Sequence, residues 1–545
     1  MILGMLSGLE PERSVLVGRA VANQTFVEAL IASQGLTELC FFVGEVRELT
    51  QIEKLAKRAP EGIRIRSRNL LELPEAIEAA AIDVLHVPDL GERVPAAIRL
   101  RNRHARHPLP VTAQIHSLSY TNSPHIYREL ILAKPAPHDA IFCSTASGRL
   151  VVENYLEHAV ETLSHHGLRA QRPDLSTLEV PLGVDAQALR GGDRGRGRDR
   201  LGLPDAAFVA LSIGRFTEYD KMDLFPLLTA FSEHVKRAPD PSYLVLAGAS
   251  QGTRTAKMAE LWAQGLGIAS NLRVLVDFPE DLKADLLAAA DLFVAPTDNP
   301  QETFGLSVVE AMAAGLPIVA SDFDGYRDTV NDQATIRIPT RWNSDLEYLS
   351  EMAPLLYQRP LHLYLGQSVE VDVSAMRAAF DTLSANGNRR RQMAEAAGAH
   401  AARYDWSNVM PRYLEAWRSL RGRAATSEYV GAQAPCPMPF KRLFSHYPSS
   451  WGDPERRVVP APGAEKMRKG RFHYPIYPEL RVAFDTGAAA AALRLAKEGI
   501  EVRALIAKMQ DRGLALWRAE SLVAWLIKHA LLVDEPQESI AEAPT

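Results

Sequence analysis

Short runs of apolar, β-branched and aromatic residues alternate with longer segments whose apolar residues recur at helical spacing. In the first third of the chain the strand-like runs are SVLVG at 14–18, LCFFVG at 39–44, IRIRS at 63–67, VLHVPD at 84–89, VTAQIHS at 111–117 and AIFCST at 140–145. The intervening segments, such as 23–35 and 147–158, carry an apolar stripe and begin at Asn or Ser. A strand followed by a helix, repeated, predicts a doubly wound α/β domain over residues 1–189.

A second series of the same kind follows. Its strand-like runs are FVALSIG at 208–214, YLVLAGA at 243–249, LRVLVDF at 272–278, LFVAPT at 292–297 and PIVASD at 317–322. They predict a second Rossmann-like domain over 205–420, which ends in a closing helix at about 405–420. Two such domains would face each other across a cleft at the carboxyl ends of their strands, and such a cleft can open and close at a hinge.

Two segments differ in composition from the predicted domains. Residues 190–204 begin with RGGDRGRGRDR, which holds five Arg, so we expect a solvated Arg/Gly-rich linker. The alternative is a patch that contacts an anionic acceptor or a membrane surface. Residues 421–485 are rich in Pro and predict an extended segment.

Residues 486–545 predict a small helical domain of unknown role. Leu522, Leu526 and Ala530 would share its buried helical face. A winged-helix-like module is an alternative, but no basic recognition stripe accompanies it, so we expect no nucleic-acid partner.

Composition narrows the class of protein. Of the 545 residues, 47% are hydrophobic and 23% are charged, which excludes a disordered or fibrous chain. The 61 Lys and Arg against 66 Asp and Glu do not supply the basic excess of a polyanion-binding protein. Three dispersed cysteines suit neither a disulfide scaffold nor a zinc site. With neither a leader pattern at the N-terminus nor an apolar run of membrane-spanning length, we expect a cytoplasmic protein.

The segment QETFGLSVVEAMAAGLPIVASDFDGYRD at 301–328 carries the strongest candidate chemistry. Phe304-Gly305 leads into a helix that runs to about Ala314, so free N–H groups and the positive end of the helix dipole face the loop that holds Glu302. This arrangement suits a phosphorylated or polyhydroxylated ligand. Glu310 lies inside the helix, so the two carboxylates can accept hydrogen bonds from hydroxyls on two parts of one molecule.

Two cations in SIGRFTEYDK at 212–221 complement these carboxylates. Arg215 follows a strand end directly and Lys221 comes six residues later, so both can point into the cleft. A pair of fixed cations there can bind a diphosphate and stabilise the charge that grows as it leaves.

These segments resemble the retaining GT-B-fold glycosyltransferases of family 4. The resemblance rests on VPLGVD, GRFTEYDK, YLVLAGA, ADLFVAPT and QETFGLSVVEAMAAGLPIVAS, and it covers roughly residues 10–420. It implies two Rossmann-like domains facing a cleft; the mainly helical C-terminal extension lies outside the resemblance. It also implies a sugar transfer from a nucleoside-diphosphate sugar to the hydroxyl of a saccharide or lipid-linked acceptor.

The resemblance assigns roles to individual residues. Arg215 and Lys221 would bind the donor diphosphate, Glu310 the ribose hydroxyls, and Glu302 with the N–H groups of Phe304, Gly305 and Leu306 the sugar hydroxyls. His116 in QIHSLSY matches the family's strand-end histidine beside the donor sugar. Gly18 stands in the loop that approaches the diphosphate, where Arg19 replaces a second glycine of the family. Arg215, Lys221, Glu302 and His116 are the candidate catalytic residues.

A metal ion is not required in this interpretation, and we expect no cofactor. Asp322-Phe323-Asp324 is a D-x-D sequence, the metal-binding signature of the other large glycosyltransferase fold. It follows a predicted strand, so Asp322 is more simply a strand-end residue or a helix cap.

Other functions remain open from the sequence. A GT-B-fold sugar-nucleotide epimerase would transform the donor without an acceptor, and a phosphorylase would need inorganic phosphate or pyridoxal phosphate. A binding protein could retain the donor site without catalysis and work through its C-terminal extension. The extension could also be an interaction or oligomerisation module on an active enzyme.

Overall fold

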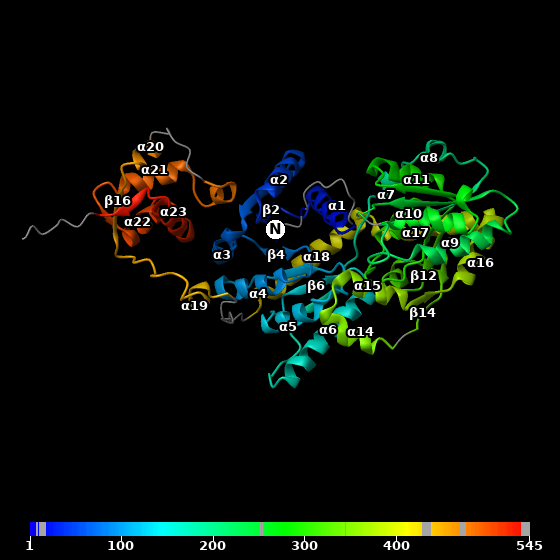
Figure 1. Cartoon of the computed structure of the whole chain (residues 1–545), viewed down its shortest axis with the longest axis horizontal. Helices are drawn as coiled ribbons and strands as arrows, with labels where there is room; N and C mark the ends of the chain where they lie inside the picture. Colours follow the sequence, from blue (N-terminus) through cyan, green and yellow to red (C-terminus); the bar gives the residue numbers. More distant parts are fainter. Residues whose placement is uncertain are drawn as a thin grey trace, which may run out of the picture. The chain divides into compact units, whose positions relative to one another are not determined.

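The computed structural model describes residues 1–6, 9, 18–250, 252, 254–343, 345–427, 438–468 and 476–535. The chain divides into two compact units, Met1–Ala434 and Pro435–Thr545, each described by itself below (Figure 1). The first unit contains both Rossmann-like domains.

The first domain is a seven-stranded parallel sheet with the order β3-β2-β1-β4-β5-β6-β7. Its strands are β1 (Ile2–Leu6), β2 (Glu38–Val43), β3 (Arg64–Asn69), β4 (Val84–Val87), β5 (Val111–Gln114), β6 (Ala140–Cys143) and β7 (Ser176–Glu179). Its helices are α1 (Gly18–Ala32), α2 (Val46–Arg58), α3 (Leu73–Glu78), α4 (Arg93–His104), α5 (Ser123–Leu132) and α6 (Ala146–His165). Helices cover both faces of the sheet, so β4, β5 and β6 are buried throughout.

The first strand differs from the expectation. Residues 2–6, not 14–18, form β1 between β2 and β4, and its Leu3 and Met5 are fully buried. Of the expected strand, residues 14–17 lie outside the described part of the chain, and Gly18 begins α1.

The second domain is a six-stranded parallel sheet with the order β10-β9-β8-β11-β12-β13. Its strands are β8 (Phe208–Ile213), β9 (Ser242–Gly248), β10 (Leu272–Val276), β11 (Leu292–Ala295), β12 (Ile318–Ser321) and β13 (Thr335–Ile338). Its helices are α9 (Leu224–Val235), α10 (Thr255–Gly265), α11 (Lys283–Ala289), α12 (Leu306–Ala313), α13 (Tyr326–Thr329), α14 (Glu347–Met352), α15 (Gln358–Gln367), α16 (Val373–Ala385) and α17 (Gly387–Ala401), and a hairpin pairs β14 (Thr340–Trp342) with β15 (Val369–Val371).

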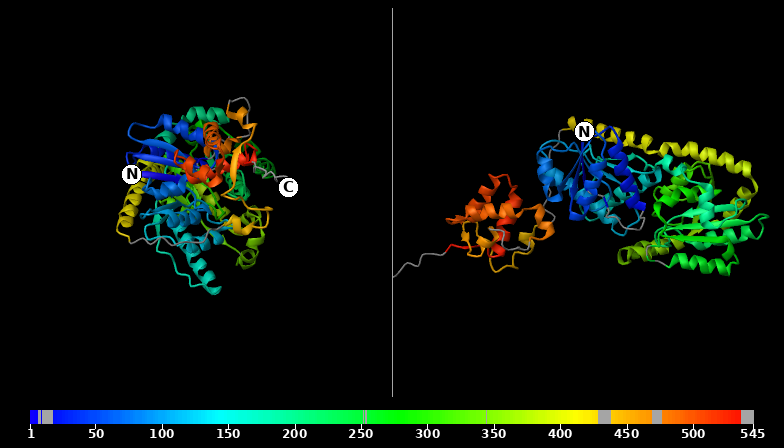
Figure 2. Two further views of the ribbon diagram at one scale, coloured as in Figure 1. Left: turned by 90° about the vertical axis from the view of Figure 1, so that its left-hand side faces the viewer. Right: turned by 90° about the horizontal axis from the view of Figure 1, so that it is seen from above.

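The closing helix, α18 (Trp406–Ala425), returns to the first domain (Figure 2). Trp417 donates its indole N–H to Thr112 Oγ1 at 3.1 Å, and the Tyr413 hydroxyl donates to Gln114 Oε1 at 2.8 Å. Both acceptors lie on β5. The chain therefore ties its two domains together a second time, after the connection near residue 190.

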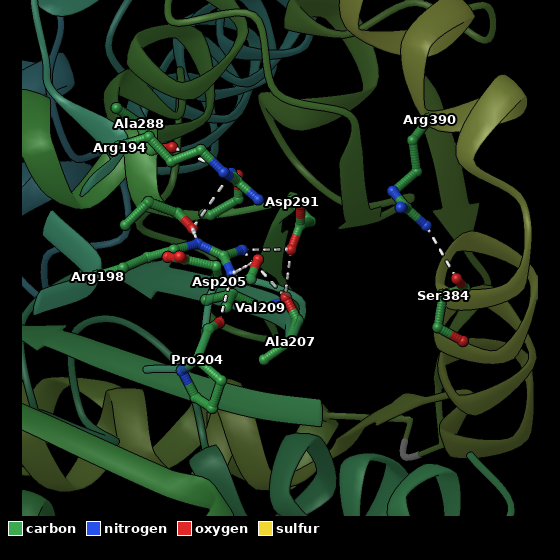
Figure 3. A network of polar contacts seen from close by, with 12 residues as sticks. Arg194, Arg198, Pro204, Asp205, Ala207, Val209, Ala288, Asp291, Ser384 and Arg390 are labelled. Atoms are coloured by element: carbon green, nitrogen blue, oxygen red, sulfur yellow. Dashed lines mark hydrogen bonds and ion pairs between the residues drawn. The ribbon is translucent and has the colours of Figure 1, made fainter. Parts of the chain in front are cut away.

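The Arg/Gly-rich segment is folded, which corrects the expectation of a solvated linker. It forms α7 (Ala186–Arg190) and α8 (Arg194–Leu201), and α8 packs on α11. Arg198 is 1% exposed and donates to four backbone carbonyls and to Asp291 at 3.0 Å (Figure 3). Arg194 pairs with Asp291 at 2.8 Å, and Arg196 donates to Asp285 Oδ1 at 2.6 Å. Internal carboxylates therefore neutralise three of the five arginines.

The C-terminal unit combines helices with a small antiparallel sheet of order β17-β16-β18. Its elements are α19 (Phe440–Leu443), β16 (Arg457–Pro460), α20 (Ala464–Arg468), α21 (Thr486–Leu495), β17 (Ile500–Glu501), α22 (Val502–Gln510), α23 (Leu516–Lys528) and β18 (Leu532–Asp534). Leu522 and Leu526 are fully buried, as expected, but Ala530 lies in an exposed turn beyond α23 with a φ of 51°.

The segment 421–485 is thus less extended than its prolines suggested, because it holds α19, β16 and α20 as well as the end of α18. Residues 428–437 and 469–475 of it lie outside the described residues. Among the helices that the structure describes, none is both long and apolar enough to cross a bilayer.

Candidate active site

A cavity of about 320 Å³ lies between the two domains of the first unit. Its walls bring together predicted site residues that are far apart in the sequence. The predicted residues that line it are His116, Arg215, Lys221, Glu302, Phe304, Gly305, Leu306 and Glu310. Gly18 begins α1, the helix whose Ala22 also lines the cavity, and the loop before it, residues 10–17, lies outside the described residues.

Glu302 is held at both carboxylate oxygens. Oε2 contacts the ammonium group of Lys221, and Oε1 accepts the N–H of Gly305 at 2.9 Å. The Gly305 N–H, which the resemblance assigns to the sugar hydroxyls, thus donates to Glu302 in this structure. Lys221 is only 9% exposed, so solvent screens its charge weakly.

Gly305 sets the start of α12. Its φ is 87°, in the left-handed region, and a Cβ built on it would lie 2.3 Å from the Tyr326 ring. The close approach places the first turn of α12 at the cavity, where Leu306 and Ser307 contribute to the wall. The N–H groups of a first helical turn have no partner within the helix, and they attract anions.

Glu310 forms a buried ion pair that the sequence did not suggest. Lys283, at the start of α11, places Nζ 3.0 Å from Glu310 Oε1 and 2.6 Å from Glu280 Oε1. Burial raises the pKa of Glu310, and Lys283 opposes this effect. Burial alone would lower the pKa of Lys283, but the two carboxylates raise it above its ordinary value. The position of Lys283 shortly after the strand-like run LRVLVDF is the signal that could have identified it.

Arg215 belongs to a polar network that bridges the domains. Its Nη2 donates to the Asp220 carbonyl at 2.9 Å, and Gln301 Nε2 donates to Asp220 Oδ1 at 3.2 Å. His362, fully buried on α15, lies 3.5 Å from the same carboxylate and donates Nε2–H to the Ser119 carbonyl at 2.9 Å. The hydrogen bond from His362 and the charge of Arg215 lower the pKa of Asp220. Sequence reasoning missed His362, since only tertiary contacts bring it here.

His116 lies at the other wall of the cavity, just after β5. Its Nε2 donates to the Pro88 carbonyl at 2.9 Å, while its own carbonyl accepts the Thr303 hydroxyl at 2.7 Å. The Thr303 carbonyl in turn accepts the Thr145 hydroxyl at 2.8 Å. The loop that carries Glu302 is therefore fastened to the first domain at two points.

The D-x-D sequence lies in a different setting. Asp322 lies 3.3 Å from Arg337 and 3.6 Å from Arg327, and Asp324 has a φ of 45°. Across the described residues, no group of three or more His, Cys, Asp or Glu side chains is arranged to hold a metal ion.

Comparison with known proteins now places the chain. The profile of the family described as Glycosyl transferases group 1 matches residues 193–346. D-inositol 3-phosphate glycosyltransferase of Geodermatophilus obscurus is 36% identical over 189 residues, which are 33% of this chain and 40% of that protein. D-inositol 3-phosphate glycosyltransferase 1 of Catenulispora acidiphila is 30% identical over 351 residues, which are 63% of this chain and 74% of that protein.

A solved structure supports the fold over a longer stretch. The Anabaena protein HepE in complex with UDP superposes with a TM-score of 0.53 at 15% identity, over 77% of this chain and 99% of that one. The matches to the first relatives span about half of those proteins' length, 40% to 54%. The two parallel sheets and this superposition confirm the expected GT-B fold. The chain belongs to the glycosyltransferases of the family described as Glycosyl transferases group 1.

Proposed function

We propose that the chain is a retaining glycosyltransferase of family 4 that transfers a sugar from a nucleoside-diphosphate sugar to an acceptor hydroxyl without a metal ion. One observation carries this proposal. The cations Arg215 and Lys221, the N-terminus of α12, and the carboxylates of Glu302 and Glu310 converge on one cavity. A nucleoside-diphosphate sugar needs both kinds of group, because cations bind its diphosphate and carboxylates accept hydrogen bonds from its ribose and sugar hydroxyls.

The donor would lie with its diphosphate between Arg215, Lys221 and the first turn of α12. Its ribose would bind near Glu310 and Lys283, and its sugar near Glu302 and His116. Asp220 fixes Arg215 and Glu302 fixes Lys221 before the reaction. The two cations can therefore stabilise the leaving diphosphate without reorganising. Arg215 and Lys221 would neutralise the charge of the leaving diphosphate, as a divalent ion does in metal-dependent glycosyltransferases.

Retention would follow from attack on the face from which the diphosphate leaves. The departing phosphate oxygen would accept the proton of the acceptor hydroxyl while the new glycosidic bond forms. The cations, already at this face, would hold the phosphate in place for that proton transfer.

The acceptor would be a saccharide, a lipid-linked saccharide or a phosphorylated cyclitol. The last of these is suggested by the relatives named for D-inositol 3-phosphate. His116 and Tyr120 belong to the first domain and line the cavity, so they would lie nearest to the acceptor.

The test measures release of nucleoside diphosphate from UDP-, GDP- and ADP-sugars in the presence of EDTA. We expect one donor to be consumed by the wild-type protein, and much more slowly by Glu302→Ala and Lys221→Ala. Lys257→Ala, which removes an exposed lysine of α10, is the matched control. Faster consumption in the presence of D-inositol 3-phosphate, with the anomeric configuration read by NMR, would identify the acceptor. Absence of release from every donor, or an inverted product, would contradict the proposal.

A further inference from the structure

The C-terminal unit exposes a cluster of large apolar side chains in one short segment. Residues 438–451, MPFKRLFSHYPSSW, surround α19. Tyr447 is 73% exposed, Phe440 61% and Trp451 49%, and Met438 and Leu443 are exposed to a similar degree. Single exposed apolar residues are common on protein surfaces, but such a concentration indicates a surface that binds something.

The segment is ordered by contacts among its own residues. The rings of Phe440 and Phe444 stack with centroids 6.1 Å apart, and Phe444 and Tyr447 lie 5.0 Å apart. Trp451 donates its indole N–H to the Ser445 carbonyl at 3.3 Å. These contacts bring the aromatic rings together on one small feature of the surface.

The charge of the segment has one sign. Lys441 and Arg442 lie on α19, and the sequence holds no Asp or Glu from 429 to 452. Lys441 Nζ lies 5.5 Å from the centre of the Trp451 ring, and within the described residues no carboxylate pairs with either cation. The arginines of α8 differ in this respect, because Asp285 and Asp291 neutralise three of them.

We propose that residues 438–451 dock the protein on an anionic lipid bilayer. Trp and Tyr are the side chains that favour the level of the lipid headgroups, where one end of the ring is apolar and the other is hydrated. Lys441 and Arg442 would meet lipid phosphates at the same depth. A segment with adjacent cations and aromatic rings, and without acidic residues, fits an anionic bilayer surface better than it fits a protein surface of mixed charge. This inference does not depend on the donor chemistry proposed above.

The test is co-sedimentation of the full chain with vesicles of phosphatidylcholine alone and of phosphatidylcholine with about a third phosphatidylglycerol. We expect binding to the anionic vesicles that weakens as salt rises. Each cation near such a surface contributes about fivefold in affinity, so Lys441→Gln/Arg442→Gln should bind roughly 25-fold more weakly. Tyr447→Ser/Trp451→Ser should also lose most of the binding.

Two controls separate this role from a general effect. Arg389→Gln/Arg391→Gln removes the same charge from the exposed side of α17, and Tyr348→Ser/Tyr357→Ser removes exposed rings elsewhere. Both should bind vesicles as the wild type does. All four variants should retain the wild-type circular dichroism.

The proposal would be overturned by equal binding of segment and control variants, by no preference for anionic vesicles, or by absence of binding by the wild type. A concentration-dependent dimer that the segment variants abolish would also overturn it, since the segment would then join two copies of the chain. Vesicle binding needs no sugar nucleotide, so its failure would leave the proposed function untouched.

Discussion

The ammonium group of Lys221 contacts the carboxylate of Glu302, 81 residues further along the chain. Lys221 follows β8 and Glu302 follows β11, two neighbouring strands of one parallel sheet, so their loops meet at the same sheet edge. The other oxygen of Glu302 accepts the Gly305 N–H, which links the cation to the start of α12. One carboxylate therefore connects the loop after β8 with the first turn of α12.

Removal of Lys221 should reduce turnover. If its charge stabilises the leaving diphosphate, Lys221→Ala lowers kcat on the order of 10²- to 10³-fold, because one preorganised group of this kind contributes about that much. Steady-state kinetics with the identified donor would show it, with Lys257→Ala as control. A rise in KM with unchanged kcat would mean that Lys221 binds the donor without acting in the transition state.

Gly305 should tolerate substitution much less well than Gly315 does. Both have a positive φ, 87° and 80°, so alanine costs about 1 to 2 kcal/mol of backbone strain at either position. Only at Gly305 would the new Cβ meet the Tyr326 ring, which adds a further 1 to 3 kcal/mol or so. Denaturant titration of the two alanine variants would measure the difference. Equal losses of stability, with activity retained in both, would refute this account of the α12 terminus.

Lys283 should stabilise the folded protein because it neutralises the buried carboxylate of Glu310. Lys283→Met leaves Glu310 buried without its partner, and breaking such a pair costs about 3 to 5 kcal/mol. Replacing both residues, as in Lys283→Met/Glu310→Leu, should restore much of the free energy of unfolding. Glu280→Gln removes the exposed partner of Lys283 and should cost no more than about 1 kcal/mol. If the double variant lost as much free energy of unfolding as the two single variants together, Lys283 and Glu310 would not be coupled.

His86 should contribute to unfolding in acid. Burial lowers the pKa of His86 to about 3, with a smaller contribution from neighbouring His116. The Thr112 hydroxyl accepts from Trp417, so it can donate its own hydrogen to His86 Nδ1, 3.0 Å away, which favours the neutral ring. A lowered histidine pKa contributes stability that is present above the unfolded pKa of about 6.5 and is lost as pH falls toward 3.

His86→Gln, which cannot titrate, should therefore flatten this dependence. Between about pH 6 and pH 4 the wild type should lose about 1.4 kcal/mol of stability per pH unit more than the variant. Urea unfolding at pH 7.5, 6, 5 and 4 would measure both slopes. Parallel slopes would exclude His86 as the titrating group.

The sequence predicted the parts of the site that follow strand ends. Arg215, Lys221, Glu302 and Glu310 could be placed because parallel strands bring their carboxyl ends to one edge of the sheet. His362 could not, because its partners Ser119 and Asp220 lie far away in the sequence and only the packed structure brings them together. Lys283 follows a strand-like run, but its pairing with Glu310 is visible only in the folded chain. The same holds for the hydrogen bond that turns the Gly305 N–H toward Glu302.

The fold shows a similar division. Apolar periodicity located most strands, but it missed β1, whose ILGML is short and contains Gly. The glycines and charges of RGRGRDRL predicted a linker, yet these residues form α8 because Asp285 and Asp291 on its neighbours pair with its arginines. Local propensity is a weak guide where buried charge pairs stabilise an element.

The most direct test of the donor site is titration calorimetry with UDP, GDP and ADP in the presence of EDTA. The account predicts that one nucleotide binds the wild type, that Lys221→Ala and Glu310→Ala weaken it at least about tenfold, and that Lys257→Ala leaves it unchanged. Binding that needs a divalent ion, or equal affinity in all four proteins, would contradict the assignment of this cavity to a sugar nucleotide.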